Sequence, residues 1–183
     1  MSKLCIVFPG RRYSCDRSLL YYPARMIEER DYDMVYLHYD LPKENEDPRP
    51  LEQCFSDCLV KAKEQTKDID FSKYDRILFL SKSIGTAVAG EIEKFYGLTN
   101  VHQVMMTPIT MTLPYIEKKD LIISSDSDHY LPDAQIVLSN FDNSYLFPKC
   151  PHSFEFKGNY ALTMKMLTAA LGVVEKYLEA INA

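Results

Sequence analysis

The stretch "ILFLSKSIGTAVAG", Ile77–Gly90, decides the fold. Four apolar residues run directly into a serine among small residues, and a helical pattern then begins without any linker. A short apolar run is typical of a buried strand, and apolar residues three and four positions apart are typical of a helix that covers it. The stretch therefore predicts a strand that turns sharply into a helix at Ser83.

The same two patterns recur along the chain and predict an alternation of strands and helices. The expected strands are residues 3–8, 33–39, 74–80, 100–106, 120–124 and 144–148, and the expected helices are residues 19–30, 51–67, 83–96 and 160–181. An acidic, proline-rich stretch at residues 41–50 predicts a surface loop. The last helix is expected to turn five residues toward the sheet: Leu162, Met166, Ala169, Val173 and Tyr177.

Strands that are apolar throughout and alternate with amphipathic helices indicate a largely parallel sheet covered on both faces. The fold class is therefore α/β, a three-layer α/β/α sandwich with a largely parallel central sheet. The sequence has no internal repeat, low-complexity tract or linker, so we predict a single domain over residues 1–183.

The composition excludes several classes of protein. The chain of 183 residues has a net charge of −5 and no cluster of Lys and Arg, which argues against a nucleic-acid partner. No apolar run approaches the roughly 20 residues that cross a bilayer, so no membrane association is expected. The apolar stretch of "MSKLCIVFPG" is too short for a signal peptide. We therefore expect a cytoplasmic protein.

The five cysteines are scattered and form no CxxC pair, so reduced thiols are the simplest interpretation. Cys54 and Cys58 lie on an apolar stripe of the second predicted helix, where cysteine behaves as a small core residue. The pattern gives no ligand set for a metal, and we expect no cofactor.

In a parallel sheet the ligand site lies beyond the carboxyl ends of the strands. The loops at these ends carry Gly10 to Tyr13, then Ser83, then Asp126 and Asp128 in "SSDSDHYLP", then His152 in "CPHSFE". A serine becomes a nucleophile when an imidazole takes its proton and a carboxylate orients that imidazole. Ser83 could also be a simple helix N-cap, a position that serine favours.

At these residues the sequence resembles the α/β-hydrolase superfamily, in particular its small members without a lid domain. Residues 81–85, "SKSIG", are similar to the G-x-S-x-G nucleophile elbow, with a serine in place of the first glycine. "SSDSDHYLP" looks like the acid loop of the family and "HSFE" like its histidine loop. The order serine, aspartate, histidine along the chain is the order of that family.

The resemblance implies a catalytic triad of Ser83, Asp128 and His152, with Asp126 as the alternative acid. It also implies an oxyanion hole formed by the backbone N–H groups of Arg11 and Ile84. The implied activity is that of a serine hydrolase, like a carboxylesterase or thioesterase, which cleaves an ester or thioester of a small acyl substrate through an acyl-enzyme. The candidates for lining the substrate pocket are Gly10, Tyr13, Tyr22 and Tyr130.

Two other functions remain open at this point. The loop Gly10-Arg11-Arg12 could bind a phosphorylated ligand or a nucleotide in a doubly wound α/β domain, although it lacks both G-x-G-x-x-G and the Walker lysine motif. A protein with the hydrolase fold that binds a ligand without catalysis is the third hypothesis. The sequence predicts no oligomeric state.

Overall fold

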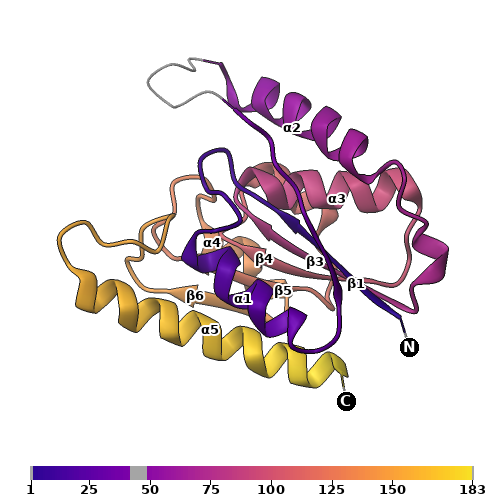
Figure 1. The fold of residues 1–183 in the computed structure, drawn as a ribbon. Helices are drawn as coiled ribbons and strands as arrows, with labels where there is room; N and C mark the ends of the chain where they lie inside the picture. The colour runs from indigo at the N-terminus through magenta and orange to yellow at the C-terminus, as the bar shows by residue number, and fades with distance from the viewer. Residues whose placement is uncertain (1, 42–48, 183) are drawn as a thin grey trace.

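The computed structural model describes residues 2–41 and 49–182 and contains a six-stranded sheet at its centre (Figure 1). Every pair of neighbouring strands is parallel, and their order in the sheet is β2-β1-β3-β4-β5-β6. The strands are β1 (Lys3–Phe8), β2 (Asp33–Tyr36), β3 (Arg76–Lys82), β4 (Val101–Met106), β5 (Leu121–Ser125) and β6 (Ser144–Phe147).

Helices cover both faces of the sheet (Figure 1). The α-helices are α1 (Ser18–Glu28), α2 (Leu51–Thr66), α3 (Ile84–Tyr96), the short α4 (Ala134–Val137) and α5 (Tyr160–Asn182). Helices α2 and α3 pack together on one face, and α1 and α5 pack together on the other. Three short 3-10 helices, η2 (Phe71–Lys73), η3 (Thr110–Tyr115) and η4 (Leu138–Asn140), lie in the connections. The predicted three-layer sandwich is confirmed.

Strand β1 shows why the central strands are apolar throughout. Leu4, Ile6 and Phe8 pack in the core under α2 and α3, while Cys5 and Val7 pack in the core under α1 and α5. Because successive side chains of a strand point to opposite faces, a strand covered on both sides has no polar face.

The second strand is shorter than predicted and ends at Tyr36. It lies at the edge of the sheet, where its one partner is β1. The Leu37 N–H still donates to the Val7 carbonyl, but β1 ends at Phe8, so the chain beyond Leu37 has no strand left to pair with. Leu37 and Tyr39 nevertheless stay buried, which explains why the sequence continues the strand pattern.

The buried face of α5 agrees with the predicted one except at Ala169: Tyr177 is buried, and Met166 and Val173 are partly buried against the core under α1 and α5. The structure buries Leu167, Ala170, Val174, Tyr177 and Leu178, whereas Ala169 is exposed. The apolar residues of α5 form a broad stripe, so their spacing alone does not fix which edge of the stripe faces the sheet. The helical spacing also predicts Phe95 on the buried face of α3 with Ile84, Val88 and Ile92. Phe95 is instead 55% exposed and packs under the Lys63 ammonium, which lies 3.8 Å from its ring centre.

All five cysteines are buried and free of disulfides. Cys54 and Cys58 lie in the core between α2 and the sheet, as predicted. Burial raises the pKa of the Cys58 thiol to about 12, which keeps it protonated and unreactive.

Residues 42–48 of the expected acidic loop lie outside the described residues. Within the part of the chain that the structure covers, no helix combines the length and the apolar character needed to cross a bilayer.

Helix α3 approaches the end of β1 so closely that Gly85 is required at their contact. A Cβ atom at this position would lie 2.4 Å from the Pro9 carbonyl oxygen and 2.5 Å from that of Phe8. Both atoms belong to the backbone, so neither can rotate away. The glycine therefore allows α3 to start directly above the sheet.

We predict that Gly85→Ala destabilises the protein by roughly 3 kcal/mol, the upper end of the usual cost of overpacking. The matched control is Gly172→Ala in α5, where an added Cβ has no neighbour within 4 Å. The control should gain roughly 0.5–1 kcal/mol, because alanine loses less backbone entropy in a helix than glycine does. Thermal unfolding of both variants checks this, and equal melting temperatures would contradict it.

Candidate active site

The turn between β3 and α3 has an unusual backbone conformation at Ser83, with φ 55° and ψ −125°. Such positive φ values are uncommon for residues other than glycine and persist where the surroundings enforce them. The Ser83 N–H donates to the carbonyl of Met106 at the end of β4 (3.0 Å), which anchors the turn. The sharp strand-to-helix turn predicted at this position is present.

Ser81, which stands in place of the first glycine of the motif, is accommodated in the turn because its hydroxyl forms a hydrogen bond. Ser81 is fully buried, and its Oγ donates to the Val104 carbonyl at 3.3 Å. The small size of the side chain and this hydrogen bond together allow the turn to form without a glycine.

Ser83 occupies the N-cap position of α3, yet its hydroxyl makes no capping hydrogen bond. The Ser83 Oγ lies instead 2.8 Å from Nε2 of His152, a residue 69 positions further along the chain. The Thr86 hydroxyl donates to the Ser83 carbonyl (2.6 Å) and supports the first turn of the helix. The contacts therefore do not fit the simple N-cap hypothesis.

His152 lies between this serine and a carboxylate. Its Nδ1 is 2.6 Å from Oδ2 of Asp128, which is 4% exposed. Because an ionised carboxylate can only accept, Nδ1 carries the proton, and Nε2 of the neutral ring is left to accept from the Ser83 hydroxyl. An imidazole in this tautomer is set up to receive a proton from serine.

The structure separates the two aspartates of the loop after β5. The second carboxylate oxygen of Asp128 accepts the Tyr130 N–H at 3.0 Å, which fixes the carboxylate that contacts His152. Asp126 is exposed and accepts the Lys149 N–H at 2.7 Å. Asp128 is thus the aspartate beside the imidazole, and Asp126 holds the turn that leads to the histidine loop.

The protonation states follow from burial and neighbouring charge. Burial lowers the pKa of His152, the hydrogen bond to Asp128 opposes this shift, and the charge of Lys82 adds to it. Burial alone would raise the pKa of Asp128, but the hydrogen bond and charge of His152 bring that pKa below its ordinary value. A neutral imidazole beside an ionised carboxylate is therefore the state expected near neutral pH.

Ser83 and His152 open into a pocket of about 390 Å³. Its lining comprises Gly10, Arg11, Arg12, Tyr13, Arg17, Leu51, Lys82, Ser83, Tyr130, His152 and Ser153. Among the described residues, no group of three or more His, Cys, Asp or Glu side chains is placed to hold a metal ion.

Three of the four predicted pocket residues, Gly10, Tyr13 and Tyr130, line this pocket. The Tyr130 ring lies 4.6 Å from the imidazole of His152. Tyr22 does not line the pocket: it is 47% exposed on α1 and packs edge-on against Tyr21.

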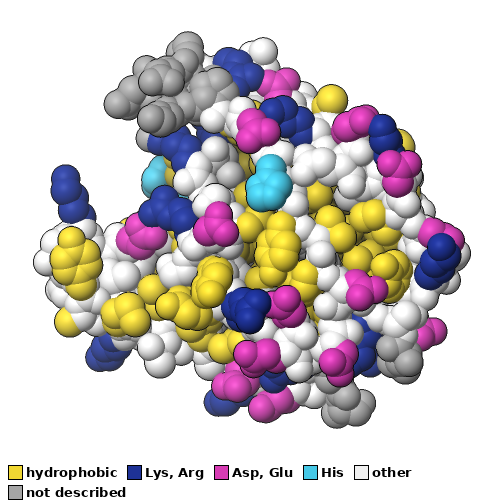
Figure 2. Space-filling model, viewed as in Figure 1, with side chains coloured by type: hydrophobic (Ala, Val, Ile, Leu, Met, Phe, Trp, Pro, Cys, Tyr) yellow, Lys and Arg dark blue, Asp and Glu magenta, His cyan; other side chains and the backbone are white. Residues whose placement is uncertain are grey.

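Figure 2 shows hydrophobic side chains gathered on the face over α1 and α5.

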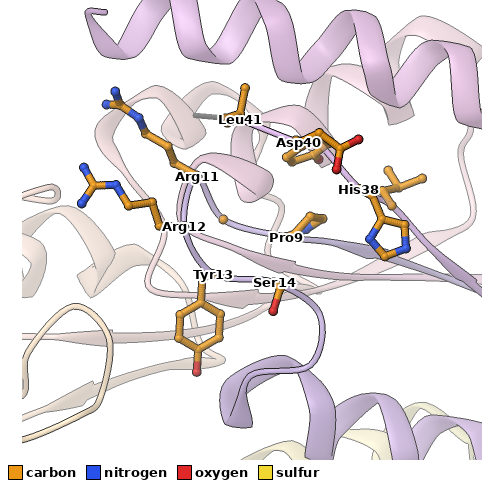
Figure 3. Close-up of a pocket in the computed structure, with 11 residues that line it drawn as sticks. Pro9, Arg11, Arg12, Tyr13, Ser14, His38, Asp40 and Leu41 are labelled. Atoms are coloured by element: carbon orange, nitrogen blue, oxygen red, sulfur yellow. The ribbon is translucent and has the colours of Figure 1, made fainter. Parts of the chain in front are cut away.

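The loop after β1 forms the opposite wall of the pocket. Gly10 and Tyr13 hold it closed through hydrogen bonds in both directions, from the Gly10 N–H to the Tyr13 carbonyl (2.9 Å) and from the Tyr13 N–H to the Gly10 carbonyl (3.4 Å). Arg11 and Arg12 lie at the tip, and their side chains extend to the same side of the loop, away from His38 (Figure 3). Across the site, Ile84 opens α3, and first-turn N–H groups have no acceptor within a helix.

Sequence reasoning missed Lys82, which is 1% exposed and lies in the wall of the pocket. Its ammonium nitrogen is 2.5 Å from the Thr107 hydroxyl and 3.0 Å from the carbonyl oxygen of His152. A signal was present, because alternation along β3 places residue 82 on the same buried face as Leu78 and Leu80.

Comparison with solved structures shows the α/β-hydrolase fold. A candidate hydrolase of the α/β superfamily from Xanthomonas campestris pv. campestris matches with a TM-score of 0.64 and 14% identity, over 98% of this chain and 99% of the other. A second Xanthomonas campestris protein, an α/β serine hydrolase without lid, has a TM-score of 0.59 and 14% identity (96% and 82% covered). Est1E from Butyrivibrio proteoclasticus with ferulic acid bound has a TM-score of 0.61 and 14% identity (99% and 90% covered).

These similarities confirm the predicted sandwich of α/β-hydrolase type without a lid domain. At such identities they concern the arrangement of the chain and not its chemistry. No protein-family model matches the sequence, and a comparison with curated protein sequences also gives no match.

We predict that Asp128→Asn lowers the pKa of His152 further, because the carboxylate hydrogen-bonds the ring and stabilises its charged form. Asp126→Asn is the matched control, since Asp126 bonds the Lys149 N–H and should leave the pKa of His152 unchanged. The imidazole proton shift in NMR titrations of both variants measures this. A larger change of the His152 pKa in the Asp126 variant would show that His152 pairs with Asp126 and not with Asp128.

Proposed function

We propose that the protein is a serine hydrolase that cleaves an acyl bond of a small substrate through an acyl-enzyme. The observation that carries the proposal is the continuous chain of hydrogen bonds from Ser83 through His152 to Asp128, with the serine on a strained turn at the carboxyl edge of the sheet. The α/β-hydrolase fold supports the same class of activity.

In the proposed reaction, Ser83 Oγ attacks the acyl carbonyl while His152 Nε2 takes its proton. Asp128 holds the ring in the required tautomer and stabilises the imidazolium. The histidine then protonates the leaving group, and a water molecule activated by the same histidine hydrolyses the acyl-enzyme. In this second step His152 takes a proton from the water and returns it to Ser83, so both side chains end in their starting protonation states.

The negative charge that develops on the carbonyl oxygen needs donors that are already in place. Ile84 supplies the N–H after the nucleophile, and Arg11 supplies an N–H from the loop after β1. Two observations support this assignment: Ile84 directly follows Ser83, and Arg11 lines the same pocket as the serine. Backbone donors suit this role because they need no reorganisation as the charge forms.

A ligand with an anionic group is the second candidate, favoured by the three arginines in the wall of the pocket. Arg11, Arg12 and Arg17 lie around the same opening as Ser83, so a phosphorylated ligand would occupy the proposed acyl site and exclude its substrate. Arg17 also pairs with Glu155 at 2.6 Å, so an anionic ligand would compete with this ion pair. Because both kinds of ligand would occupy the same pocket, one experiment can distinguish the two candidates.

We predict that a fluorophosphonate probe labels the wild-type protein on Ser83, because a serine activated by an imidazole attacks phosphorus and ordinary serines do not. Ser83→Ala should abolish labelling. The control is Ser153→Ala, which alters a serine of the same pocket whose hydroxyl accepts the Glu155 N–H, and which should leave labelling intact. Mass spectrometry of the labelled peptide identifies the site.

Labelling that persists in Ser83→Ala would refute the assignment of the nucleophile. A wild type that never reacts with the probe but binds inorganic phosphate or a nucleotide in calorimetry would favour the anion-binding candidate.

We also predict that the rate of labelling falls at acidic pH with a midpoint below 6.5, the ordinary pKa of histidine. The base must be neutral to accept a proton, and burial lowers the pKa of His152, so activity persists to a lower pH than for an exposed histidine. The second-order rate constant measured from pH 4 to pH 9 gives the midpoint. A midpoint above 6.5 would mean that His152 is not the titrating base.

A further inference from the structure

Lys82 is a buried basic residue at the centre of the site, and the proposed reaction does not use it. It ends β3 and directly precedes Ser83, so its backbone is part of the turn that carries the nucleophile. Its side chain reaches across to the histidine loop and donates to the carbonyl of His152. One side chain thus connects the nucleophile turn with the backbone of the base.

The histidine loop needs such a connection because it has little structure of its own. Residues 148–159 contain no helix or strand between β6 and α5. The Cys150 N–H donates to the Ser125 hydroxyl (3.0 Å), and Glu155 pairs with Arg17 at the rim. The Lys149 N–H also donates to Asp126 (2.7 Å). The contact from Lys82 differs from these because it reaches the backbone of His152.

The surroundings of the Lys82 ammonium suit a donor that is held in place. Its nitrogen lies 3.0 Å from the His152 carbonyl, 2.5 Å from the Thr107 hydroxyl and 5.1 Å from the centre of the Tyr13 ring. The Tyr13 ring also lies 4.8 Å from the Arg17 guanidinium. Two acceptors and an aromatic face replace the water that burial removes from a lysine.

The charge of Lys82 acts on the same imidazole that the side chain helps to hold. The charged or titratable groups facing His152 are Lys82, Asp128, His129 and Tyr130. Those facing Lys82 are Asp128, Arg17, Glu155 and Tyr13. A positive charge disfavours the imidazolium, whereas the carboxylate of Asp128 favours it.

Burial lowers the fraction of molecules in which Lys82 is protonated. It lowers the pKa of Lys82 to about 7, against the opposing effect of Asp128. Below neutral pH the lysine is therefore charged, in the range where His152 would otherwise take up a proton.

We propose that Lys82 is a positioning residue for the base of this site: it holds the backbone of His152 against the nucleophile turn, and its charge keeps the imidazole unprotonated. The proposal rests on the proposed function for its effect on rate. Its effect on the ionisation of His152 does not depend on that function.

Two substitutions separate the tether from the charge. Lys82→Met removes both the hydrogen bond and the charge from a side chain of similar length. Lys82→Gln removes the charge but keeps an N–H donor that can bond the His152 carbonyl. Lys157→Gln is the matched control, because it makes the same substitution at an exposed lysine of the histidine loop.

We expect the acid midpoint of fluorophosphonate labelling to move to higher pH in Lys82→Met and Lys82→Gln and to stay unchanged in Lys157→Gln. The plateau rate at high pH should fall roughly 10 to 100-fold in Lys82→Met, the usual effect of a small misplacement of a reacting group, and less in Lys82→Gln. NMR titration of His152 should show the same upward shift of its pKa in both lysine variants, whether or not the protein is an enzyme.

The outcomes distinguish this proposal from the proposed function. If the wild type is labelled and both lysine variants keep its midpoint and plateau, Lys82 has a purely structural role and the proposal is wrong. If the wild type is not labelled, the hydrolase proposal fails, and the NMR titration alone decides whether Lys82 controls His152. An unchanged or lower pKa of His152 in Lys82→Gln overturns the electrostatic role.

Discussion

The contact between the backbone of α3 and the carboxyl end of β1 is the constraint on which the rest of this structure depends. With no side chain at Gly85, the helix starts directly above the sheet, and the chain must then reverse at Ser83 within a single residue. The strained backbone at that residue is held by the Met106 carbonyl below it and by Thr86 above it. The turn gives the Ser83 hydroxyl a position outside the helix, where a partner from another loop can reach it.

The parallel sheet explains how residues far apart in the sequence reach this turn. Ser83, Asp128 and His152 follow β3, β5 and β6, and their pairwise contacts join residues 69 and 24 positions apart. All strands run the same way, so every loop that follows a strand lies at one edge of the sheet. The geometry of the site therefore depends on the register of several strands at once. Each loop contributes one or two side chains, and the sheet fixes the positions of the loops relative to one another.

The sequence predicted the layers of this fold better than its details. Apolar strands and periodic helices report burial directly, and the strand bounds of β1 and the helix over Leu51–Thr66 were nearly as expected. On α5 the prediction was wrong for Ala169, because a broad apolar stripe leaves the exact rotation of a helix to tertiary packing. Short elements such as α4 and η3 carry too few residues to form a periodic pattern.

The same distinction holds for the site. Ser83, Asp128 and His152 could be chosen because each is a reactive residue at a strand end, and the structure brings their side chains into hydrogen-bonding distance. Tyr22 was misplaced because nearness in sequence to the loop after β1 says nothing about which side of α1 it occupies. Lys82 was missed because a lysine beside a turn suggests a solvated charge, and its burial depends on acceptors from the loop after β4 and from the histidine loop.

Burying Lys82 has a physical consequence for the whole site. A buried ammonium with too few partners is costly, so an apolar residue would serve packing better at this position. The lysine is satisfied here by the Thr107 hydroxyl, the His152 carbonyl and the face of Tyr13, and each of these comes from a different strand end. Moving any one of the three loops would leave this charge with fewer partners. The penalty for an unsatisfied lysine thus favours the closed arrangement of the loops, in which His152 meets both Ser83 and Asp128.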